Sequence, residues 1–168
     1  MNYSELTESF STSPERQQKA IFSTLFIAGN RLQTLFDARI PEVSLKQFML
    51  LTLVRQSREP LPLTQLGELL GCSRQNVRKL ADALAKKGFV TLAPSPRDAR
   101  ALCLSLTERA DAFFANDFSR YEAELGELFA VYTNEERAAL FALLTRLYAG
   151  IDRLERHIAE EAQGGESE

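Results

Sequence analysis

Apolar residues recur every three or four positions along most of the chain, which is the spacing of an amphipathic helix. The first such segment runs from Pro14 to about Asp37. Ser13 can cap it, and a proline suits the first turn of a helix. Its apolar stripe consists of Ile21, Leu25, Ala28, Leu32 and Leu35. We therefore expect a long first helix that buries one face.

Two shorter helices are predicted next. Ser44 and Gln47 can form a capping box, and the segment LKQFMLLTLVRQ that follows Ser44 is apolar almost all round, so we expect it to be buried. Residues 58–62, REPLP, form a stiff connector. Thr64 is expected to cap a short third helix, TQLGELLG, that ends at Gly71.

A fourth helix is expected over residues 74–87. Ser73 can cap its start, and Gly88 can take the left-handed conformation that ends a helix. Its length would be about 21 Å, at about 1.5 Å per residue. Its apolar stripe consists of Val77, Leu80, Ala81 and Leu84. Most of the charged and amide side chains fall on the other side, which predicts one buried face and one polar face.

An alternating pattern then predicts a β-hairpin. The stretches FVTLA and ALCLSL would pair around an exposed tip with the sequence SPRDAR. Leu102, Leu104 and Leu106 point to one face of the second strand, because side chains alternate along a strand. Cys103 points to the opposite face, and we expect it to be partly exposed.

Two long helices complete the pattern. Thr107 can cap the fifth helix, and Thr133 with Glu136 can form a capping box at the start of the sixth. The apolar positions of the sixth helix are Leu140, Leu144, Leu147, Ile151, Leu154 and Ile158. Their spacing of four and three residues is heptad-like, and it continues beyond what a small domain needs to cover itself. This seam indicates a partner helix.

Composition narrows the function classes. Of the 168 residues, 45% are hydrophobic, and no apolar run of 18 residues that could span a membrane is present. The first residues, MNYSELTESFSTSPERQQ, lack the basic-then-apolar order of a secretory signal, so we expect a cytoplasmic protein without a membrane partner. Cys72 and Cys103 form no CxxC pair and His157 is the single histidine, so no metal or cofactor is expected.

Charge is distributed unevenly along the chain. The formal net charge is −3, yet residues 72–100 carry seven basic and two acidic side chains and have a net charge of +5. Residues 101–168 carry fourteen acidic and six basic side chains. A basic segment inside an acidic chain indicates a cationic face, which is typical of nucleic-acid binding and also of a simple solvated helix.

The order of elements supports the first of these two interpretations. A short helix, a tight GCS turn and a basic amphipathic helix form a helix-turn-helix pattern, and the hairpin after it would be a wing. With the fourth helix in the major groove, the wing tip can reach the neighbouring minor groove. Arginine suits that place because a narrow minor groove concentrates negative potential. Asp98 would orient an arginine of the tip by a charge-assisted hydrogen bond.

From about residue 20 to 160 the sequence resembles the MarR family of winged helix-turn-helix regulators. The resemblance is carried by SLKQFMLLTLV, by LTQLGELLGCSRQNVRKLADALAKKGFV and by SPRDARALCLSLTERA. It implies an interlocked dimer built from the first and last two helices, with the winged domains below it and a small molecule bound in the crevice between. One departure is that GFVTLAPS lacks the arginine that family wings often carry after the first strand.

Carried over by position, the resemblance implies a DNA-contacting set. The expected residues are Ser73, Arg74, Gln75, Asn76, Arg78, Lys79, Arg97, Asp98 and Arg100. Gln75 and Asn76 can read adenine edges, whereas Arg74 and Arg78 can read guanine or hold phosphate. Arg100 would enter the minor groove. Lys79, Lys86 and Lys87 are either phosphate contacts or solvated charges.

The prediction is thus a mainly α protein with a small β-hairpin wing, a winged helix-turn-helix joined to a helical dimerisation region. Its parts are a flexible arm at 1–13, a dimerisation region at 14–40 and 108–161, a DNA-binding domain at 41–107 and a disordered tail at 162–168. The predicted function is a homodimeric, sequence-specific regulator of transcription, a repressor, that binds a pseudo-palindromic double-stranded DNA operator and responds to a phenolic or aromatic effector.

Two other function classes compete with this prediction. A protein–protein module that has lost DNA binding would fit the acidic pI of about 5.4 and the uncharged first wing strand. An enzyme is not predicted, because no Ser/His/Asp set, Gly-rich phosphate loop or paired carboxylates in a plausible cleft is found. Cys72 stands beside the cap of the fourth helix and could sense oxidants, but a structural role is favoured for both cysteines. The effector-binding residues stay unknown.

Overall fold

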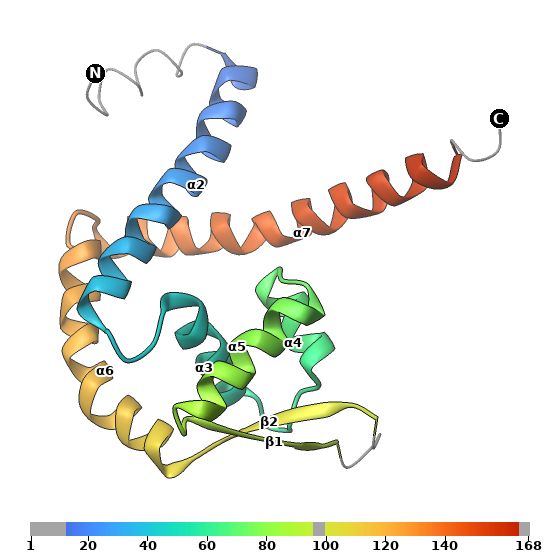
Figure 1. Cartoon of the computed structure of the whole chain (residues 1–168). Coiled ribbons are helices and arrows are strands. Elements are labelled where there is room, and N and C mark those ends of the chain that lie inside the picture. The colour runs from blue at the N-terminus through green and yellow to red at the C-terminus, as the bar shows by residue number, and fades with distance from the viewer. Residues whose placement is uncertain (1–12, 96–99, 165–168) are drawn as a thin grey trace. The chain divides into compact units, whose positions relative to one another are not determined.

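The computed structural model describes residues 13–95 and 100–164, which are helical apart from one hairpin (Figure 1). The elements are α2 (Pro14–Arg39), α3 (Leu45–Gln56), α4 (Leu63–Leu70), α5 (Arg74–Lys86), β1 (Val90–Pro94), β2 (Leu102–Leu106), α6 (Glu108–Phe129) and α7 (Asn134–Gly164). They form two compact units, Met1–Phe113 and Phe114–Glu168. The predicted fold class, mainly helical with a two-stranded antiparallel hairpin, is confirmed.

Helix α2 begins where the sequence predicted. Ser13 Oγ accepts a hydrogen bond from the backbone N–H of Arg16 at 3.3 Å, and Pro14 occupies the first turn. Backbone hydrogen bonding, and then the Ser13 side chain, lower the pKa of Glu15 in that turn. The expected burial of its apolar stripe is not seen in the single chain, where Ile21 is 59% and Leu35 is 61% exposed. Within its own compact unit, the described residues therefore leave much of this apolar stripe exposed.

Helix α3 has the predicted capping box. Ser44 Oγ accepts from the backbone N–H of Gln47 at 3.3 Å, and Gln47 Oε1 accepts from the backbone N–H of Ser44 at 3.1 Å. The expectation of burial all round is wrong on one side, because Met49 is 39% exposed. The buried residues of the helix are Gln47, Phe48, Leu50 and Leu51. The capping residues determine where the helix starts, whereas the neighbouring elements determine which faces of the helix are buried.

The predicted cap of α4 is wrong. The helix begins at Leu63, its N-cap is Pro62, and no side chain makes a capping hydrogen bond. The Pro62 carbonyl accepts from the backbone N–H of Leu66 at 3.0 Å, so the helix starts two residues earlier than a Thr64 cap would allow. Leu63 is 5% exposed, and its burial favours the earlier start over a side-chain cap at Thr64.

The turn between α4 and α5 is tight. Gly71 has φ 61°, in the left-handed region that favours glycine, and the backbone N–H of Cys72 bonds to the Gly67 carbonyl at 2.8 Å. Ser73 Oγ then accepts from the backbone N–H of Asn76 at 3.3 Å, which confirms the predicted cap of α5. A Cβ added at Gly67 would lie 2.8 Å from the Cys72 carbonyl oxygen. The backbone of this turn leaves no room for a side chain at position 67.

We expect Gly67→Ala to lower the free energy of unfolding by about 1–3 kcal/mol, the range for overpacking a filled site. The cause is the contact with a backbone carbonyl, which cannot rotate away as a side chain can. Urea unfolding followed by circular dichroism measures it. Gly126→Ala in α6 is the control, because a Cβ there meets nothing within 4 Å and should stabilise the helix by about 0.5–1 kcal/mol. Equal effects of both substitutions would contradict the packing argument.

Strands β1 and β2 form the predicted hairpin. They pair antiparallel from Val90 with Leu106 to Pro94 with Leu102, and the backbone N–H of Ser95 bonds to the Ala101 carbonyl at 2.8 Å. The expected exposure of Cys103 is wrong, because it is 4% exposed. The connector before α4 covers that face of β2: Pro62 forms a bridge with Cys103, whose Sγ lies 3.7 Å from the Pro60 carbonyl.

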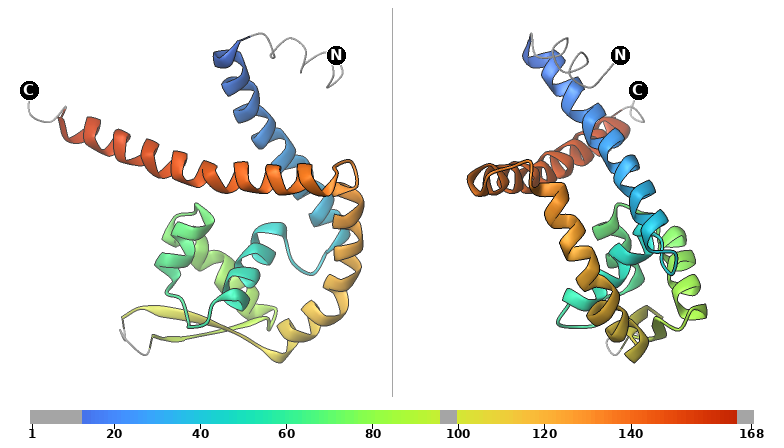
Figure 2. Two further views of the ribbon diagram at one scale, coloured as in Figure 1. Left: turned by 180° about the vertical axis from the view of Figure 1, so that it is seen from behind. Right: turned by 90° about the vertical axis from the view of Figure 1, so that its left-hand side faces the viewer.

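The core of the first unit contains a chain of aromatic rings. Phe36 and Phe48 have ring centroids 5.1 Å apart, Phe48 and Phe113 lie 6.4 Å apart, and Phe113 meets Phe89 edge-on at 5.5 Å and 86°. These rings come from α2, α3, α6 and the residue before β1. Seen from behind and from the side, α3, α4 and α5 cluster beside the hairpin (Figure 2). The rings therefore pack α2, α3 and the start of α6 around Phe89, in the segment that joins α5 to β1.

The second unit contains most of α6 and the whole of α7. Thr133 and Glu136 form the predicted capping box, with hydrogen bonds of 2.8 and 3.2 Å. Helix α7 continues through Gly164, so residues 162–164 of the predicted tail are helical, and residues 165–168 lie outside the described residues. Along its predicted seam, Leu144, Leu147, Ile151, Leu154 and Ile158 are between 40% and 57% exposed.

Candidate nucleic-acid interface

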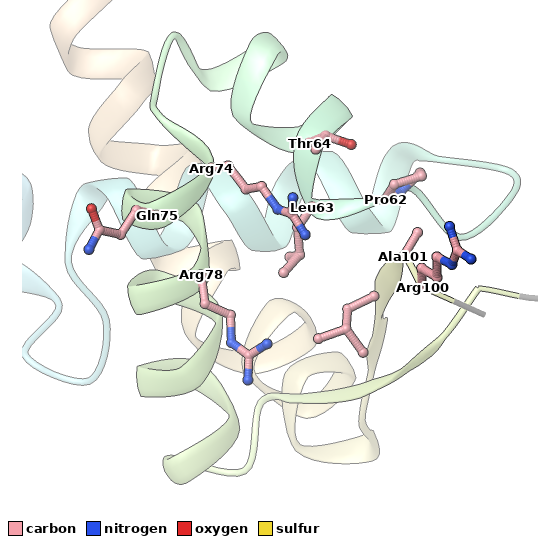
Figure 3. A pocket seen from close by; sticks show the side chains of 9 residues that line it. Pro62, Leu63, Thr64, Arg74, Gln75, Arg78, Arg100 and Ala101 are labelled. Carbon is pink, nitrogen blue, oxygen red and sulfur yellow. The ribbon is translucent and has the colours of Figure 1, made fainter. Parts of the chain in front are cut away.

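A groove of about 640 Å³ lies between the start of α4, helix α5 and strand β2 (Figure 3). The residues that line it are Pro62, Leu63, Thr64, Arg74, Gln75, Arg78, Arg100, Ala101 and Leu102. Four of the predicted DNA-contacting residues are among them. The groove therefore brings the helix-turn-helix and the wing together at one surface.

Local structure explains how the arginines converge. Arg74 and Arg78 are four residues apart on α5 and so lie on one face of the helix. Figure 3 shows both side chains extending from α5 into the groove, whereas Gln75 turns its amide away from them. Arg100 comes from the other side, two residues before β2. Two separate elements thus supply positive charge to one hollow.

The groove combines cations with an apolar floor. Of the nine lining residues that the structure describes, three are arginines and none is acidic. Pro62, Leu63, Ala101 and Leu102 supply the apolar part. Arginine guanidinium groups donate planar, charge-assisted hydrogen bonds to phosphate and to the O6 and N7 atoms of guanine. This arrangement suits a polyanion with flat bases, such as duplex DNA.

The other predicted contact residues lie outside the groove lining. Ser73, Asn76 and Lys79 are exposed on α5 or at its cap, and the Ser73 hydroxyl accepts the capping bond from Asn76. Arg97 and Asp98 fall outside the described residues. Of the wing residues to which a DNA contact was assigned, Arg100 is therefore the one that the structure describes.

Lys87 is exposed, and it also makes contacts that the sequence did not suggest. Its Nζ donates to the Glu42 carbonyl at 2.8 Å and to Gln47 Oε1 at 3.2 Å. Gln47 is 8% exposed and belongs to the capping box of α3. Lys87 thus ties the end of α5 to the segment before α3, and its charge serves the fold. The sequence held no local signal for this contact, because the partners are 45 and 40 residues away.

The base of the wing has contacts beyond the predicted cap at Thr107, and sequence reasoning missed these further contacts. Thr107 Oγ1 donates to the carbonyls of Gly88 and Phe89, at 2.6 and 3.1 Å, while it caps α6 through the backbone N–H of Ala110. The guanidinium carbon of Arg109 lies 4.8 Å from the centre of the Phe89 ring. These contacts fix where the hairpin leaves the core, and so they fix the direction of β2.

Other candidate chemistry finds little support. Over residues 13–95 and 100–164, no group of three or more His, Cys, Asp or Glu side chains could hold a metal ion. Cys72 and Cys103 are free thiols, and Cys72 Sγ lies 3.6 Å from the Leu70 carbonyl. His157 is exposed, as predicted, with Nε2 3.3 Å from Glu161 Oε1. In the described part of the chain, no helix is both long and apolar enough to cross a membrane.

A tight turn between two helices, followed by a hairpin that shares a groove with the second helix, defines a winged helix-turn-helix protein. Residues 43–102 match the family model described as MarR family. The chain is similar to the transcriptional repressor MprA of Escherichia coli K12, with 29% identity over 107 residues. That alignment spans 64% of this chain and 61% of MprA.

Solved structures show the same fold. A MarR transcriptional regulator from Methanosarcina mazei Go1 aligns with a TM-score of 0.72 at 18% identity, over 81% of this chain and 99% of that one. The PcaV transcriptional regulator from Streptomyces coelicolor, solved in complex with its natural ligand, aligns with a TM-score of 0.65 at 18% identity, over 83% and 94%. The family model and MprA support the resemblance to the MarR family that the sequence indicated, and the solved structures share the fold.

Proposed function

We propose that the protein is a homodimeric, sequence-specific DNA-binding regulator of transcription that acts as a repressor and responds to a small aromatic effector. The observation that carries the proposal is the groove that is lined by Arg74 and Arg78 of α5 and by Arg100 of the wing. In a winged helix-turn-helix, the second helix enters the major groove of DNA while the wing lies beside it. The three arginines stand where both elements would meet the duplex.

The homodimer is supported by apolar surface that one chain leaves open. Helices α2 and α7 both carry large hydrophobic side chains that are more than a third exposed, including Phe22 at 77% and Leu154 at 57%. Contiguous apolar surface of this kind usually marks an interface. The two-fold symmetry of a dimer would place two α5 helices on half-sites about 10 bp apart. An operator with a pseudo-palindromic sequence follows from that geometry.

We expect the protein to sediment as a dimer of its 18.9 kDa chain at micromolar concentration. Leu154→Glu should shift it toward the monomer, because burying an unpaired carboxylate in the seam is costly. Ala149→Glu adds the same charge two residues beyond Leu147, off the predicted seam, and is expected to leave the dimer intact. Sedimentation velocity of the three proteins measures this. A wild-type monomer would contradict the dimer, and equal dissociation of both variants would contradict the seam.

The proposed response to an effector and the proposed repressor role are based on similar proteins. MprA is named a transcriptional repressor, and PcaV was solved with its natural ligand. A ligand that binds one spacing of the two winged domains better than another would change operator affinity by that difference in binding free energy. Phenolic and aromatic acids are therefore the first compounds to test on the protein–DNA complex.

The test of this function is fluorescence anisotropy with the DNA upstream of the protein's own gene and with a scrambled duplex, each at two salt concentrations. We expect tight binding to the native fragment that weakens steeply with salt, because each neutralised phosphate releases counterions. Aromatic acids are then added to the preformed complex. If no duplex binds even at low salt, the DNA-binding function is wrong and a protein–protein module replaces it.

A further inference from the structure

Arg78, which lines the groove, is held by a carboxylate one turn further along the same helix. Its Nε atom lies 2.9 Å from Oδ1 and 3.0 Å from Oδ2 of Asp82. The spacing of four residues places both side chains on one face of α5, where they are 48% and 44% exposed. The pair therefore lies on the surface that α5 presents to solvent and to the groove, and not in the core.

The contact uses one particular nitrogen of the guanidinium group. Both hydrogen bonds to Asp82 come from Nε, so neither uses the terminal nitrogens Nη1 and Nη2. An arginine can approach O6 and N7 of guanine end-on, with Nη1 and Nη2, or side-on, with Nε and one Nη. Because Asp82 occupies Nε, the end-on approach is the one left to Arg78.

Fold stability does not account for this pair. Exposed ion pairs at this spacing contribute little to the free energy of unfolding, because water and salt screen them. Asp82 is the single acidic residue in the α5 sequence RQNVRKLADALAK, and a carboxylate on this face repels DNA phosphates. Its direct effect on DNA affinity is therefore unfavourable, which leaves the orientation of Arg78 as its useful effect.

We propose that Asp82 is a positioning residue that fixes Arg78 for end-on recognition of one guanine in each half-site. The proposal rests on the proposed function, since it requires α5 to enter the major groove. A preoriented arginine loses less side-chain freedom when it binds its correct base. At any other base the two hydrogen bonds are not both made, and the repulsion between Asp82 and the phosphates is not offset. Asp82 thus lowers the affinity for DNA of any sequence, and it increases the preference for guanine at the base pair that Arg78 contacts.

The experiment selects bound duplexes from a randomised pool with the wild type, Arg78→Ala, Asp82→Asn and Asp82→Glu, and then measures the affinity of single base-pair variants of the selected site. Arg78→Ala should abolish the preference for guanine at one base pair of each half-site. Asp82→Asn should reduce the preference for guanine at that same base pair by about threefold or more. This loss is a part of the discrimination between bases that a bidentate arginine contact supplies. Its affinity for random duplex should equal or exceed that of the wild type.

Two variants serve as controls. Asp82→Glu keeps the charge and the pairing and is expected to retain the guanine preference. Asp152→Asn removes the same charge from an exposed position on α7, remote in sequence from the basic helix, and should behave as the wild type does. Thermal melting of each variant establishes that it is folded as the wild type is.

Three results would overturn the proposal while leaving the proposed function in place. Asp82→Asn could keep the full guanine preference, could lose preference equally at every base pair, or could change a base pair other than the one that depends on Arg78. A wild-type protein that binds no duplex at all would instead overturn both. The two failures are therefore distinguishable in one set of measurements.

Discussion

Arg100→Ala is expected to weaken binding to the operator by about tenfold or more, within the range that one well-placed arginine contributes. Arg100 lines the groove together with Arg74 and Arg78 and lies two residues before β2. Its removal takes away the arginine that the described part of the wing contributes to the groove. Anisotropy titrations at several salt concentrations measure the change. The slope of log affinity against log salt should also fall by about one if Arg100 neutralises a phosphate.

The control for Arg100→Ala is the loss of an arginine elsewhere. Arg153→Ala removes an exposed arginine from α7 and changes the net charge by the same amount. We expect it to alter operator affinity little, because α7 belongs to the second compact unit and contributes none of the described residues that line the groove. Arg100→Ala should also leave the melting temperature unchanged, since the side chain is exposed. Operator binding by Arg100→Ala as tight as that of the wild type would contradict the assignment of the wing.

Sequence reasoning succeeded where structure is determined locally. The caps at Ser13, Ser44, Ser73 and Thr133 each depend on a side chain and a backbone group three residues away, and all four are present. Gly88 has φ 76°, as the end of α5 requires. The order of helix, turn, helix and hairpin follows from such signals together with the period of the apolar positions.

The errors lie where distant segments meet. A capping pattern at Thr64 competed with the burial of Leu63 against the rest of the domain, and burial determined the helix start. The alternation along β2 predicted one exposed face, but the connector near Pro60 covers Cys103. Lys87 is bound by residues more than 35 positions away. No local pattern contains these contacts, because they arise only after the chain has folded.

The candidate site was predicted in part for the same reason. The charged residues of α5 and the wing were identified from their types and order, and the groove brings Arg74, Arg78 and Arg100 together. The floor of the groove at Pro62 and Leu63 was missed, since these residues carry no charge and belong to a connector and a buried helix start. Residues that contact a ligand can be identified in a sequence by their charge and polarity. The surfaces that shape a groove depend instead on how the folded chain packs.

Phe89→Ala is expected to lower the free energy of unfolding by about 3–5 kcal/mol, the range for removing a buried phenylalanine. The Phe89 side chain is fully buried, meets the Phe113 ring edge-on at 5.5 Å, and lies under the Arg109 guanidinium at 4.8 Å. The cavity would open between α6 and the base of the wing. Such a loss is a large share of the roughly 5–15 kcal/mol that stabilises a typical domain.

Urea unfolding of Phe89→Ala, with Leu69→Ala as the matched apolar truncation, measures this loss. Leu69 is 55% exposed on α4, so its truncation should change the free energy of unfolding by no more than about 0.5 kcal/mol. Because Phe89 stands between the end of α5 and β1, the variant should also bind operator more weakly, at temperatures where it is still folded. A cost below about 1 kcal/mol would contradict the central place of Phe89 in the core, since the removed ring and its cavity both contribute. Unchanged operator affinity in the folded variant would mean that the wing is positioned without it, by the bonds from Thr107 to the carbonyls of Gly88 and Phe89.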